Sequence, residues 1–368
     1  MAKGNSKSKY YSLNNILKNN AVYNVIIGER SNGKTYSVLK YAVEHYFKTG
    51  GRLAVIRRWS EDIKGRRASD MFSALLHNNE IEKLSEGKYT GITYYAGKWY
   101  MCNYDEKGKA IYNDSDLFAY AFSLSDTEHN KSISYPTVEI VLFDEFLTRQ
   151  VYLQNEFVLF MNTLSTIIRD RTNVQIFMLG NTVNKYSPYF VEMGLSNVEN
   201  QKQGTIDIYK YGDSKLTVAV EYCDKMGEEK KNNYYFAFDN PKLNMIKTGA
   251  WELDLYPHLM SPYKPKDILF TFFIEFNFNL YQCEVINLKN QLFIYIHDKT
   301  TPLKNPDKDL VYSLEHNPKV NYNRNVLKPA FKIGTKIAAL FSQGKVFYQD
   351  NTVGDAINNY LNNCKRIK

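Results

Sequence analysis

The sequence VYNVIIGERSNGKT, residues 22–35, predicts a strand, a turn and a helix. Val22–Ile27 is an apolar run typical of a buried strand, and Thr35–Phe47 continues with helical spacing. Between them, the chain fits G-x-x-x-x-G-K-[ST] in full, in the context that this phosphate-binding motif requires. Its glycines let backbone N–H groups surround phosphate oxygens, and the helix N-terminus adds a positive end. We therefore expect a nucleotide site made of Gly28, Glu29, Arg30, Ser31, Asn32, Gly33, Lys34 and Thr35.

Two acidic residues complete the expected site. The apolar run Val138–Phe143 predicts a buried strand that delivers Asp144 and Glu145 side by side at its end. Lys34 would reach the β and γ oxygens of ATP, and the Thr35 hydroxyl would bind Mg²⁺ together with Asp144. Glu145 would orient the attacking water. An apolar run followed by two acids is weak evidence alone, but it is strong evidence beside a complete phosphate-binding motif.

Three further polar residues leave alternatives open. Asn181 follows the apolar strand Val174–Leu179, where it could contact the γ-phosphate or could equally cap the next turn. Arg169 and Arg171 lie between an expected helix, Phe157–Ile168, and that strand. Such an arginine can stabilise transition-state charge in its own subunit or in a neighbour's. A solvated arginine at a helix C-terminus is the ordinary alternative.

The order of segments predicts two folded units. Strands alternate with helices up to residue 197, which favours an α/β domain with a mainly parallel sheet and helices on both faces. Local expectations include a helix over Asp70–Leu84, a hairpin over Lys98–Asn113 and an antiparallel meander that starts with a strand over Ile268–Gln282. We expect four segments: a flexible basic tail at 1–10, a P-loop ATPase domain at 11–197, a linker or lid subdomain at 198–255, and a basic α+β domain at 256–368.

The composition is that of a folded protein, with 44% hydrophobic and 23% charged residues. A net charge of +8 favours anionic partners such as nucleic acid, although ordinary solubility explains it equally well. The four cysteines are far apart, which indicates free thiols rather than a disulfide framework or a zinc site. No apolar run approaches the roughly 18 residues of a membrane span, and the basic N-terminus lacks the apolar segment of a signal peptide. We therefore expect a cytosolic protein with no membrane partner.

Several of these segments together resemble the DNA-packaging (encapsidation) ATPases of small protein-primed podophages, which are relatives of the terminase large subunits. The likeness is close over residues 20–190 and weaker beyond. The matching stretches occur in the family's order and at similar separations. They are VIIGERSNGKTY, AVIRRW, NKSISYPTVEIVLFDEF, TIIRDRTNV and LGNTVNKYSPYF.

The resemblance implies a homomeric ring of five copies that pushes double-stranded DNA into a procapsid. The ring would act in the cytoplasm of the infected host cell and transiently at the portal, or connector, of the procapsid. The resemblance leaves open whether a structural packaging RNA takes part. It makes Asp144 the Walker B acid and Glu145 the catalytic carboxylate, beside Lys34 and Thr35 as ligands of nucleotide and Mg²⁺. Arg169 falls on the family's arginine finger, which acts on the adjacent subunit.

Three other arginines match the family without a settled role. Arg30 matches within the P-loop. Arg57 and Arg58 follow the second strand, Leu53–Arg58, as in the family. There they would contact a neighbouring subunit or the phosphates, and the alternative is that they are surface charges.

The same resemblance makes the C-terminal unit an RNase H-like domain. Terminase nucleases bind two metal ions through several carboxylates. In the sequence FFIEFNFNLY, Glu275 is the only acid, and Asn277 and Asn279 stand where aspartates would be needed. Asp298 and Asp350 remain as further candidates. We therefore expect a vestigial nuclease domain.

Positive charge is concentrated near the C-terminus. From Lys319 onward there are nine Lys or Arg residues against two Asp residues, a net charge of +7. Such a segment could grip DNA or a structural RNA at the portal, or it could be a solvated helix face. Four basic residues recur every four positions, although Pro329 prevents one unbroken helix. They are Arg324, Lys328, Lys332 and Lys336.

The resulting hypothesis is ATP hydrolysis at subunit interfaces, with Glu145 orienting water and Arg169 acting in trans. Hydrolysis would move the linker and the C-terminal domain against the ATPase core and so drive DNA through the ring. Four alternatives remain: a nucleotide kinase, a helicase or other nucleic-acid translocase, a nucleic-acid-binding structural protein, and a metal-dependent nuclease-ATPase. The adjacent acids and the long basic C-terminal half argue against a kinase.

Overall fold

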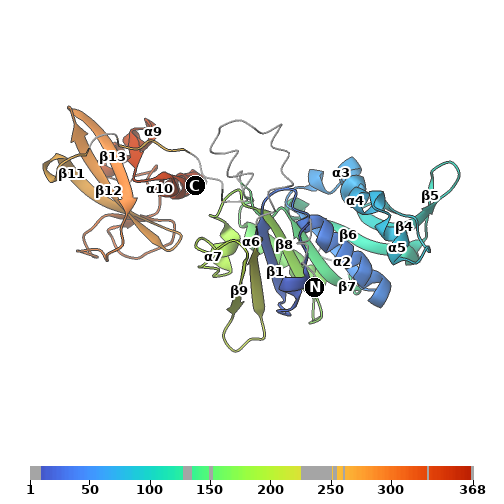
Figure 1. Cartoon of the computed structure of the whole chain (residues 1–368). Helices are drawn as coiled ribbons and strands as arrows, with labels where there is room; N and C mark the ends of the chain where they lie inside the picture. Colours follow the sequence, from blue (N-terminus) through green and yellow to red (C-terminus); the bar gives the residue numbers. More distant parts are fainter. Residues whose placement is uncertain are drawn as a thin grey trace, which may run out of the picture. The chain divides into compact units, whose positions relative to one another are not determined.

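The computed structural model describes residues 10–126, 135–148, 152–224, 251, 255–259, 262–329 and 331–365. The chain divides into two compact units, Met1–Glu252 and Leu253–Lys368. Figure 1 shows a large twisted sheet with helices in the first unit and a smaller sheet with the helices α9 (Lys332–Ser342) and α10 (Asn351–Cys364) in the second. Within the described ranges, no helix is long and apolar enough to cross a bilayer. All four cysteines are free and buried. Of the basic tail expected at 1–10, residues 1–9 lie outside the described residues.

A ten-stranded sheet forms the centre of the first unit, in the order β3-β4-β6-β2-β7-β8-β1-β10-β9, with β5 paired to β4. Six adjacent strands run parallel to one another, which confirms the mainly parallel sheet: β6, β2, β7, β8, β1 and β10. The antiparallel pair β4–β5 confirms the hairpin expected at Lys98–Asn113. The strands are β1 (Tyr23–Gly28), β2 (Arg52–Arg57), β3 (Gly91–Tyr95), β4 (Lys98–Tyr104), β5 (Ala110–Ile111), β6 (Leu117–Ser123), β7 (Val138–Asp144), β8 (Gln175–Asn181), β9 (Thr205–Lys210) and β10 (Thr217–Tyr222).

Helices cover both faces of this sheet. Successive residues of a strand point to opposite sides of the sheet, and apolar residues on both sides of β1 pack against helices. Val25 and Ile27 of β1 belong to one core, which also contains Phe160 of α6. Ile26 belongs to the other core, which contains Val38 of α2. The helices of this unit are α1 (Asn14–Leu17), α2 (Lys34–Thr49), α3 (Gly65–Ser69), α4 (Ser73–His77), α5 (Glu80–Leu84), α6 (Glu156–Ile168) and α7 (Pro188–Glu192), with 3₁₀ turns at Ser60–Asp62, Asp70–Phe72 and Asp114–Asp116.

Two local expectations are wrong. The helix expected over Asp70–Leu84 is broken into a 3₁₀ turn and two short helices, since Asn79 has a φ of 53°, which a right-handed helix cannot contain. The strand expected over Ile268–Gln282 is a hairpin. Its turn residues, Asn277 and Phe278, have φ values of 51° and 64°, as a tight two-residue turn requires.

The expected linker subdomain at 198–255 also differs from the structure. Strands β9 and β10 form a hairpin within the main sheet, and β10 pairs in parallel with β1 from Tyr23 opposite Val218 to Ile27 opposite Tyr222. The physical reason is that β10 is apolar and buried, which suits an internal position beside β1. Trp251 packs on Phe190 and Tyr222, so it belongs to the first unit too. Residues 225–250 lie outside the described residues.

The second unit is an α+β domain, as expected. Its six-stranded sheet has the order β15-β14-β11-β12-β13-β16. Phe272, Cys283 and Ile294, from the three central strands, are buried together with Ile337 of α9 and Tyr360 of α10. The elements are a 3₁₀ turn at Pro265–Asp267, β11 (Ile268–Phe276), β12 (Asn279–Leu288), β13 (Gln291–Asp298), β14 (Val311–Ser313), β15 (Tyr322–Asn323), α9 (Lys332–Ser342), β16 (Val346–Tyr348) and α10 (Asn351–Cys364).

Candidate functional site

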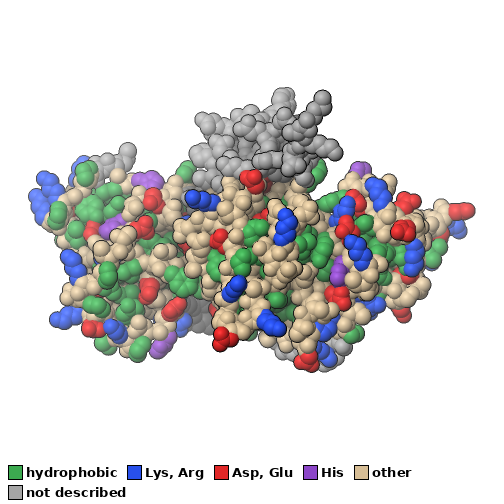
Figure 2. Space-filling view, turned by 60° about the horizontal axis from the view of Figure 1, so that its bottom comes forward, with side chains coloured by type: hydrophobic (Ala, Val, Ile, Leu, Met, Phe, Trp, Pro, Cys, Tyr) green, Lys and Arg blue, Asp and Glu red, His purple; other side chains and the backbone are tan. Residues whose placement is uncertain are grey.

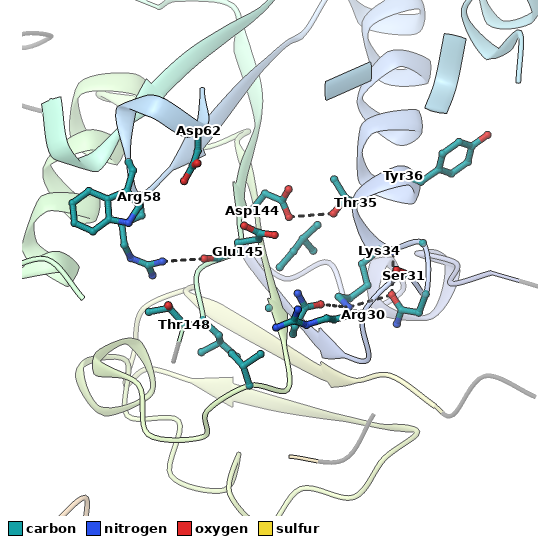
Figure 3. Close-up of a pocket in the computed structure, with 18 residues that line it drawn as sticks. Arg30, Ser31, Lys34, Thr35, Tyr36, Arg58, Asp62, Asp144, Glu145 and Thr148 are labelled. Atoms are coloured by element: carbon teal, nitrogen blue, oxygen red, sulfur yellow. Dashed lines mark hydrogen bonds between the residues drawn. The ribbon is translucent and has the colours of Figure 1, made fainter. Parts of the chain in front are cut away.

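A polar cleft of about 650 Å³ opens at the carboxyl ends of β1, β7 and β8. Parallel strands deliver their terminal residues to the same edge of a sheet, which is why segments far apart in sequence meet there. Figure 3 shows side chains from the P-loop, the end of β7 and the segment after β2 converging on this cleft. Nine of the predicted residues line it: Arg30, Ser31, Asn32, Gly33, Lys34, Thr35, Asp144, Glu145 and Asn181.

Both glycines of the motif are required by the local geometry. Gly33 caps the N-terminus of α2 with a φ of 92°, which favours glycine. A Cβ added to Gly28 would lie 2.8 Å from the Cβ of Cys223, which follows β10. The P-loop therefore packs directly against the end of β10. Neither Gly28, the last residue of β1, nor the buried Glu29 lines the cleft.

Lys34 places an ammonium group in the cleft, and its side chain is buried. Its Nζ donates to the Glu29 carbonyl at 2.7 Å and to the side chains of Asn32 and Asn181 at 3.1 and 3.3 Å. Burial lowers the pKa of this ammonium, and the nearby Cys223, Asp144 and Glu29 oppose that shift. A buried ammonium beside a helix N-terminus is a suitable environment for phosphate oxygens. The Asn181 side chain thus lies in the cleft beside Lys34, and its contact with the γ-phosphate stays a prediction.

Thr35 and Asp144 form the second part of the cleft. The Thr35 hydroxyl donates to Oδ1 of Asp144 at 3.1 Å (Figure 3). Burial raises the pKa of Asp144, and the charge of Arg57 opposes this. A hydroxyl and a carboxylate oxygen are the ligands that Mg²⁺ uses beside substrate phosphates. The donor set therefore fits Mg²⁺. Among the described residues, there is no cluster of three or more His, Cys, Asp or Glu side chains that could hold a metal alone.

Glu145 extends from the end of β7 into the cleft, with its side chain 61% exposed. Its φ is +61°, an uncommon conformation for a residue other than glycine, and such residues cluster at functional sites. Arg57 contacts both acids, with Nη1 at 2.7 Å from Glu145 and Nη2 at 2.8 Å from Asp144. Arg57 is therefore part of the site, where it contacts both acids, and is not a surface charge.

Arg58 is buried on the other side of Glu145. Its Nε lies 2.8 and 3.0 Å from the two carboxylate oxygens of Glu156, and Nη2 donates to the Phe146 carbonyl at 2.6 Å. Nη1 donates to the Glu145 carbonyl at 3.3 Å (Figure 3). Burial alone would lower the pKa of this guanidinium, but Glu156 raises it above its usual value. Sequence analysis missed Glu156, since an acid at the start of a helix is ordinary.

The two arginines after α6 differ in environment. Arg171 is tied to its surroundings, because its guanidinium donates to carbonyls of Ile168 and Pro136 at 3.1 and 2.9 Å. Arg169 is exposed at the C-terminal end of α6 and does not line the cleft. It precedes β8, so it lies at the sheet edge opposite the carboxyl ends of the strands. In its own chain, Arg169 is therefore outside the nucleotide cleft.

Among the described residues of the second unit, the three candidate nuclease acids do not form a metal-binding cluster. Glu275 is exposed on β11 opposite Ser313 of β14. Asp298 ends β13. Asp350 is the N-cap of α10, and its Oδ1 accepts from the Val353 N–H at 2.9 Å. The Gln349 side chain links two of these acids, since its Oε1 accepts from the Asp298 N–H at 3.2 Å and its Nε2 donates to Oδ2 of Asp350 at 3.3 Å.

The basic stripe is not one helix face. Lys332 and Lys336 are exposed on α9, whereas Arg324 and Lys328 precede that helix. Arg324 donates to the Leu314 carbonyl at 3.1 Å. In the view of Figure 2, lysine and arginine side chains are interspersed with acidic ones over the surface. The expected stripe is therefore divided between a loop and a helix.

Comparisons with known proteins identify a family and several relatives of this chain. The family model described as podovirus DNA encapsidation protein (Gp16) matches residues 5–364. The DNA packaging proteins of Bacillus phages PZA and phi29 are each 25% identical to this chain over 340 residues, which cover 89% of this chain and 92% of each relative. The structure of the bacteriophage phi29 viral genome packaging motor assembly is similar with a TM-score of 0.58 and 20% identity, covering 98% of this chain and 99% of that chain.

Proposed function

Since this chain belongs to the podovirus DNA encapsidation family, we propose that it is an ATP-hydrolysing motor that moves double-stranded viral DNA into a procapsid. Membership in that family makes it a DNA-packaging protein related to the phi29 motor. The observation that carries the enzymatic proposal is the convergence of Lys34, Thr35, Asp144 and Glu145 on one cleft. A buried ammonium, a hydroxyl beside a carboxylate, and a second exposed carboxylate are the groups that phosphoryl transfer to water needs.

Each group has a role that follows from its position. Lys34 binds the β and γ oxygens of ATP, with Asn181 beside it at 3.3 Å. Mg²⁺, held by Thr35 and Asp144, would neutralise charge on the phosphates. Glu145 accepts a hydrogen bond from the attacking water and orients it toward the γ-phosphorus. To do so, its carboxylate must turn away from Arg57.

The position of Arg169 supports action on a neighbouring subunit. It lies outside its own cleft and at the opposite edge of the sheet, so it could reach a phosphate only in another copy. A copy that gives an arginine at one surface and receives one at another forms a head-to-tail interface, and such interfaces generate a ring when the rotation between copies closes. The family resemblance favours five copies. We place this ring at the procapsid portal in the host cytoplasm, with a structural RNA as a candidate partner.

The decisive experiment is ATP turnover by the purified chain, with and without long double-stranded DNA, at low and high salt. A motor that grips the DNA backbone should be stimulated by DNA, and the stimulation should fade as salt rises. Glu145→Gln is the control for contaminating ATPases. Equal turnover with and without DNA, in the presence of procapsids as well, would contradict the motor. Strand separation without packaging would favour the helicase alternative, and Mg²⁺-dependent DNA cleavage would favour the nuclease.

A further inference from the structure

Helix α6 and strand β7 lie against each other and have nearly the same length. The seven residues of β7 and the thirteen of α6 each span roughly 20 Å. Phe143 of β7 packs on Phe160 of α6, with ring centroids 5.0 Å apart. The strand leads to Glu145 at the cleft, and the helix returns to Arg169 at the other edge of the sheet. The pair thus joins the two residues assigned to hydrolysis in neighbouring sites.

At the cleft end, the helix is fixed to the backbone of Glu145. Glu156 is the first residue of α6, and its side chain is fully buried. It accepts from Arg58, and Arg58 donates in turn to the carbonyls of Glu145 and Phe146. Tyr189 also donates to Oε1 of the Glu156 carboxylate, at 2.8 Å. The uncommon backbone conformation of Glu145 is therefore held by an ion pair that starts on α6.

At the other end, the helix is fixed to the start of β7. The Arg171 guanidinium donates to the carbonyls of Ile167 and Ile168 in the last turn of α6. It also donates to the carbonyls of Pro136 and Val138 at the start of β7. Because one planar group bridges both elements, the last turn of α6 cannot move along β7 without breaking these bonds.

We propose that α6 and β7 form a closed frame that fixes Arg169 relative to Glu145, with Glu156 and Arg171 as positioning residues. A packed helix tied at both ends moves as one body, so a displacement of Glu145 during hydrolysis is passed along the frame to Arg169. The state of one nucleotide site thereby determines the position of Arg169, which that subunit presents to the next site. This inference rests on the proposed function, because it assumes that Arg169 acts in trans.

The test is complementation between two inactive variants in mixed assemblies with DNA and procapsids. Arg169→Ala subunits keep an intact cleft but lack the arginine, whereas Glu145→Gln subunits keep the arginine but cannot hydrolyse ATP. Mixing them should restore turnover at interfaces where a Glu145→Gln subunit donates Arg169. The frame is then tested in donors that carry Glu156→Gln in addition to Glu145→Gln. Both donors have inactive clefts, so any difference between them reflects donation of Arg169 across the length of α6.

We expect donors with Glu156→Gln to restore about ten-fold less turnover than donors with Glu145→Gln alone, because small misplacements of a catalytic group are costly. A donor with Glu145→Gln and Glu106→Gln is the matched control, since Glu106 is an exposed glutamate in the β4–β5 turn. It should restore turnover in full. Equal restoration by all three donors would overturn the frame. No restoration by any donor would instead contradict the trans arginine, and so the proposed function itself.

Loss of the Glu156 charge leaves Arg58 buried without its ionic partner, which destabilises the fold. Circular dichroism and nucleotide binding by each donor therefore accompany the assay. If the Glu156→Gln donor does not fold, Tyr189→Phe takes its place. It removes one hydrogen bond to Glu156 and keeps the ring in the core. This donor should restore two- to five-fold less turnover than the control, and full restoration would overturn the frame.

Discussion

Arg57 holds the carboxylate of Glu145 by an ion pair of 2.7 Å, although that carboxylate is largely exposed to solvent. The same guanidinium contacts Asp144 at 2.8 Å, so one residue at the end of β2 restrains both acids at the end of β7. Exposed ion pairs contribute about 0.2–1 kcal/mol. Arg57 therefore restrains Glu145 without locking it, and the carboxylate can exchange between the arginine and the attacking water.

Replacing Arg57 by glutamine should raise ATP turnover in the absence of DNA by up to about five-fold, since about 1 kcal/mol of restraint on Glu145 is removed. The rate of phosphate release under steady-state conditions measures this turnover. Arg52→Gln, at the other end of β2, is the matched control and should have no effect. A fall in turnover with normal ATP binding would show instead that Arg57 stabilises the transition state.

Glu145→Gln should lower turnover by about 10² to 10⁴, the usual contribution of a positioned base, while the affinity for ATP stays within about two-fold of the parent. Lys34→Ala should instead abolish ATP binding, since it removes the buried ammonium of the cleft. Equilibrium binding of a fluorescent ATP analogue separates the two variants. Hydrolysis at the parental rate by Glu145→Gln would exclude it as the residue that orients water.

Replacing the two arginines after α6 by alanine should affect different properties: turnover for Arg169 and stability for Arg171. Arg169→Ala should lower turnover by about 10³ or more and leave the melting temperature unchanged, because the side chain is exposed and serves a neighbour. Arg171→Ala should lower the melting temperature by several degrees, since it removes the hydrogen bonds between α6 and β7. Parental turnover by Arg169→Ala in assembled rings would refute its role.

Of the acids of the second unit, Asp350 should matter for stability and Glu275 should not, and neither should support DNA cleavage. Asp350→Ala should cost about 1 kcal/mol of unfolding free energy, because it removes the N-cap of α10. Glu275→Ala should have little effect, since Glu275 is exposed on β11. Urea unfolding measures both. Incubation of plasmid DNA with Mg²⁺ or Mn²⁺ tests cleavage, and cleavage that disappears in Glu275→Ala would revive the nuclease alternative.

Stability should depend on the charge of Glu221 on β10. Burial raises its pKa above the usual range, although the Tyr11 hydroxyl, which donates to it at 2.6 Å, opposes the shift. The folded protein therefore binds this proton more tightly than the unfolded chain does. The contribution of Glu221 to stability is full below the unfolded pKa of about 4.3 and is lost as pH rises through the folded pKa. Urea unfolding of Glu221→Gln between pH 4 and 7.5 checks this, since its advantage over the parent should grow with pH. A constant difference would contradict the assignment.

The nucleotide cleft could be predicted from sequence because its chemistry depends on short contiguous motifs. Residues 28–35 and the pair Asp144–Glu145 carry their own context of apolar strands, and parallel strands bring them to one edge of the sheet. The roles of Arg57 and Arg58 could not be assigned, since two consecutive arginines point to opposite sides of a strand end. Only the neighbours in space, Asp144 and Glu156, distinguish them.

Domain boundaries were harder to predict than the cleft. Residues 198–224 are rich in polar residues, so their composition indicated a separate linker, but one short apolar strand among them pairs with β1. Pairing between β1 and β10 joins residues nearly 200 positions apart, and no local pattern specifies such a contact. The broken helix at Asn79 was missed for a related reason, because helical spacing continued across a residue in the left-handed conformation.

The position of β10 beside β1 also determines which fragments of this protein can be produced alone. A fragment ending at residue 197 would expose the edge of β1, with its unpaired backbone groups, and such apolar edges promote aggregation. It would also remove the support that Cys223 gives to Gly28 of the P-loop. A soluble fragment with a working nucleotide cleft therefore has to extend at least through residue 223. For this family member, the C-terminal boundary of a fragment therefore determines whether the fragment binds ATP.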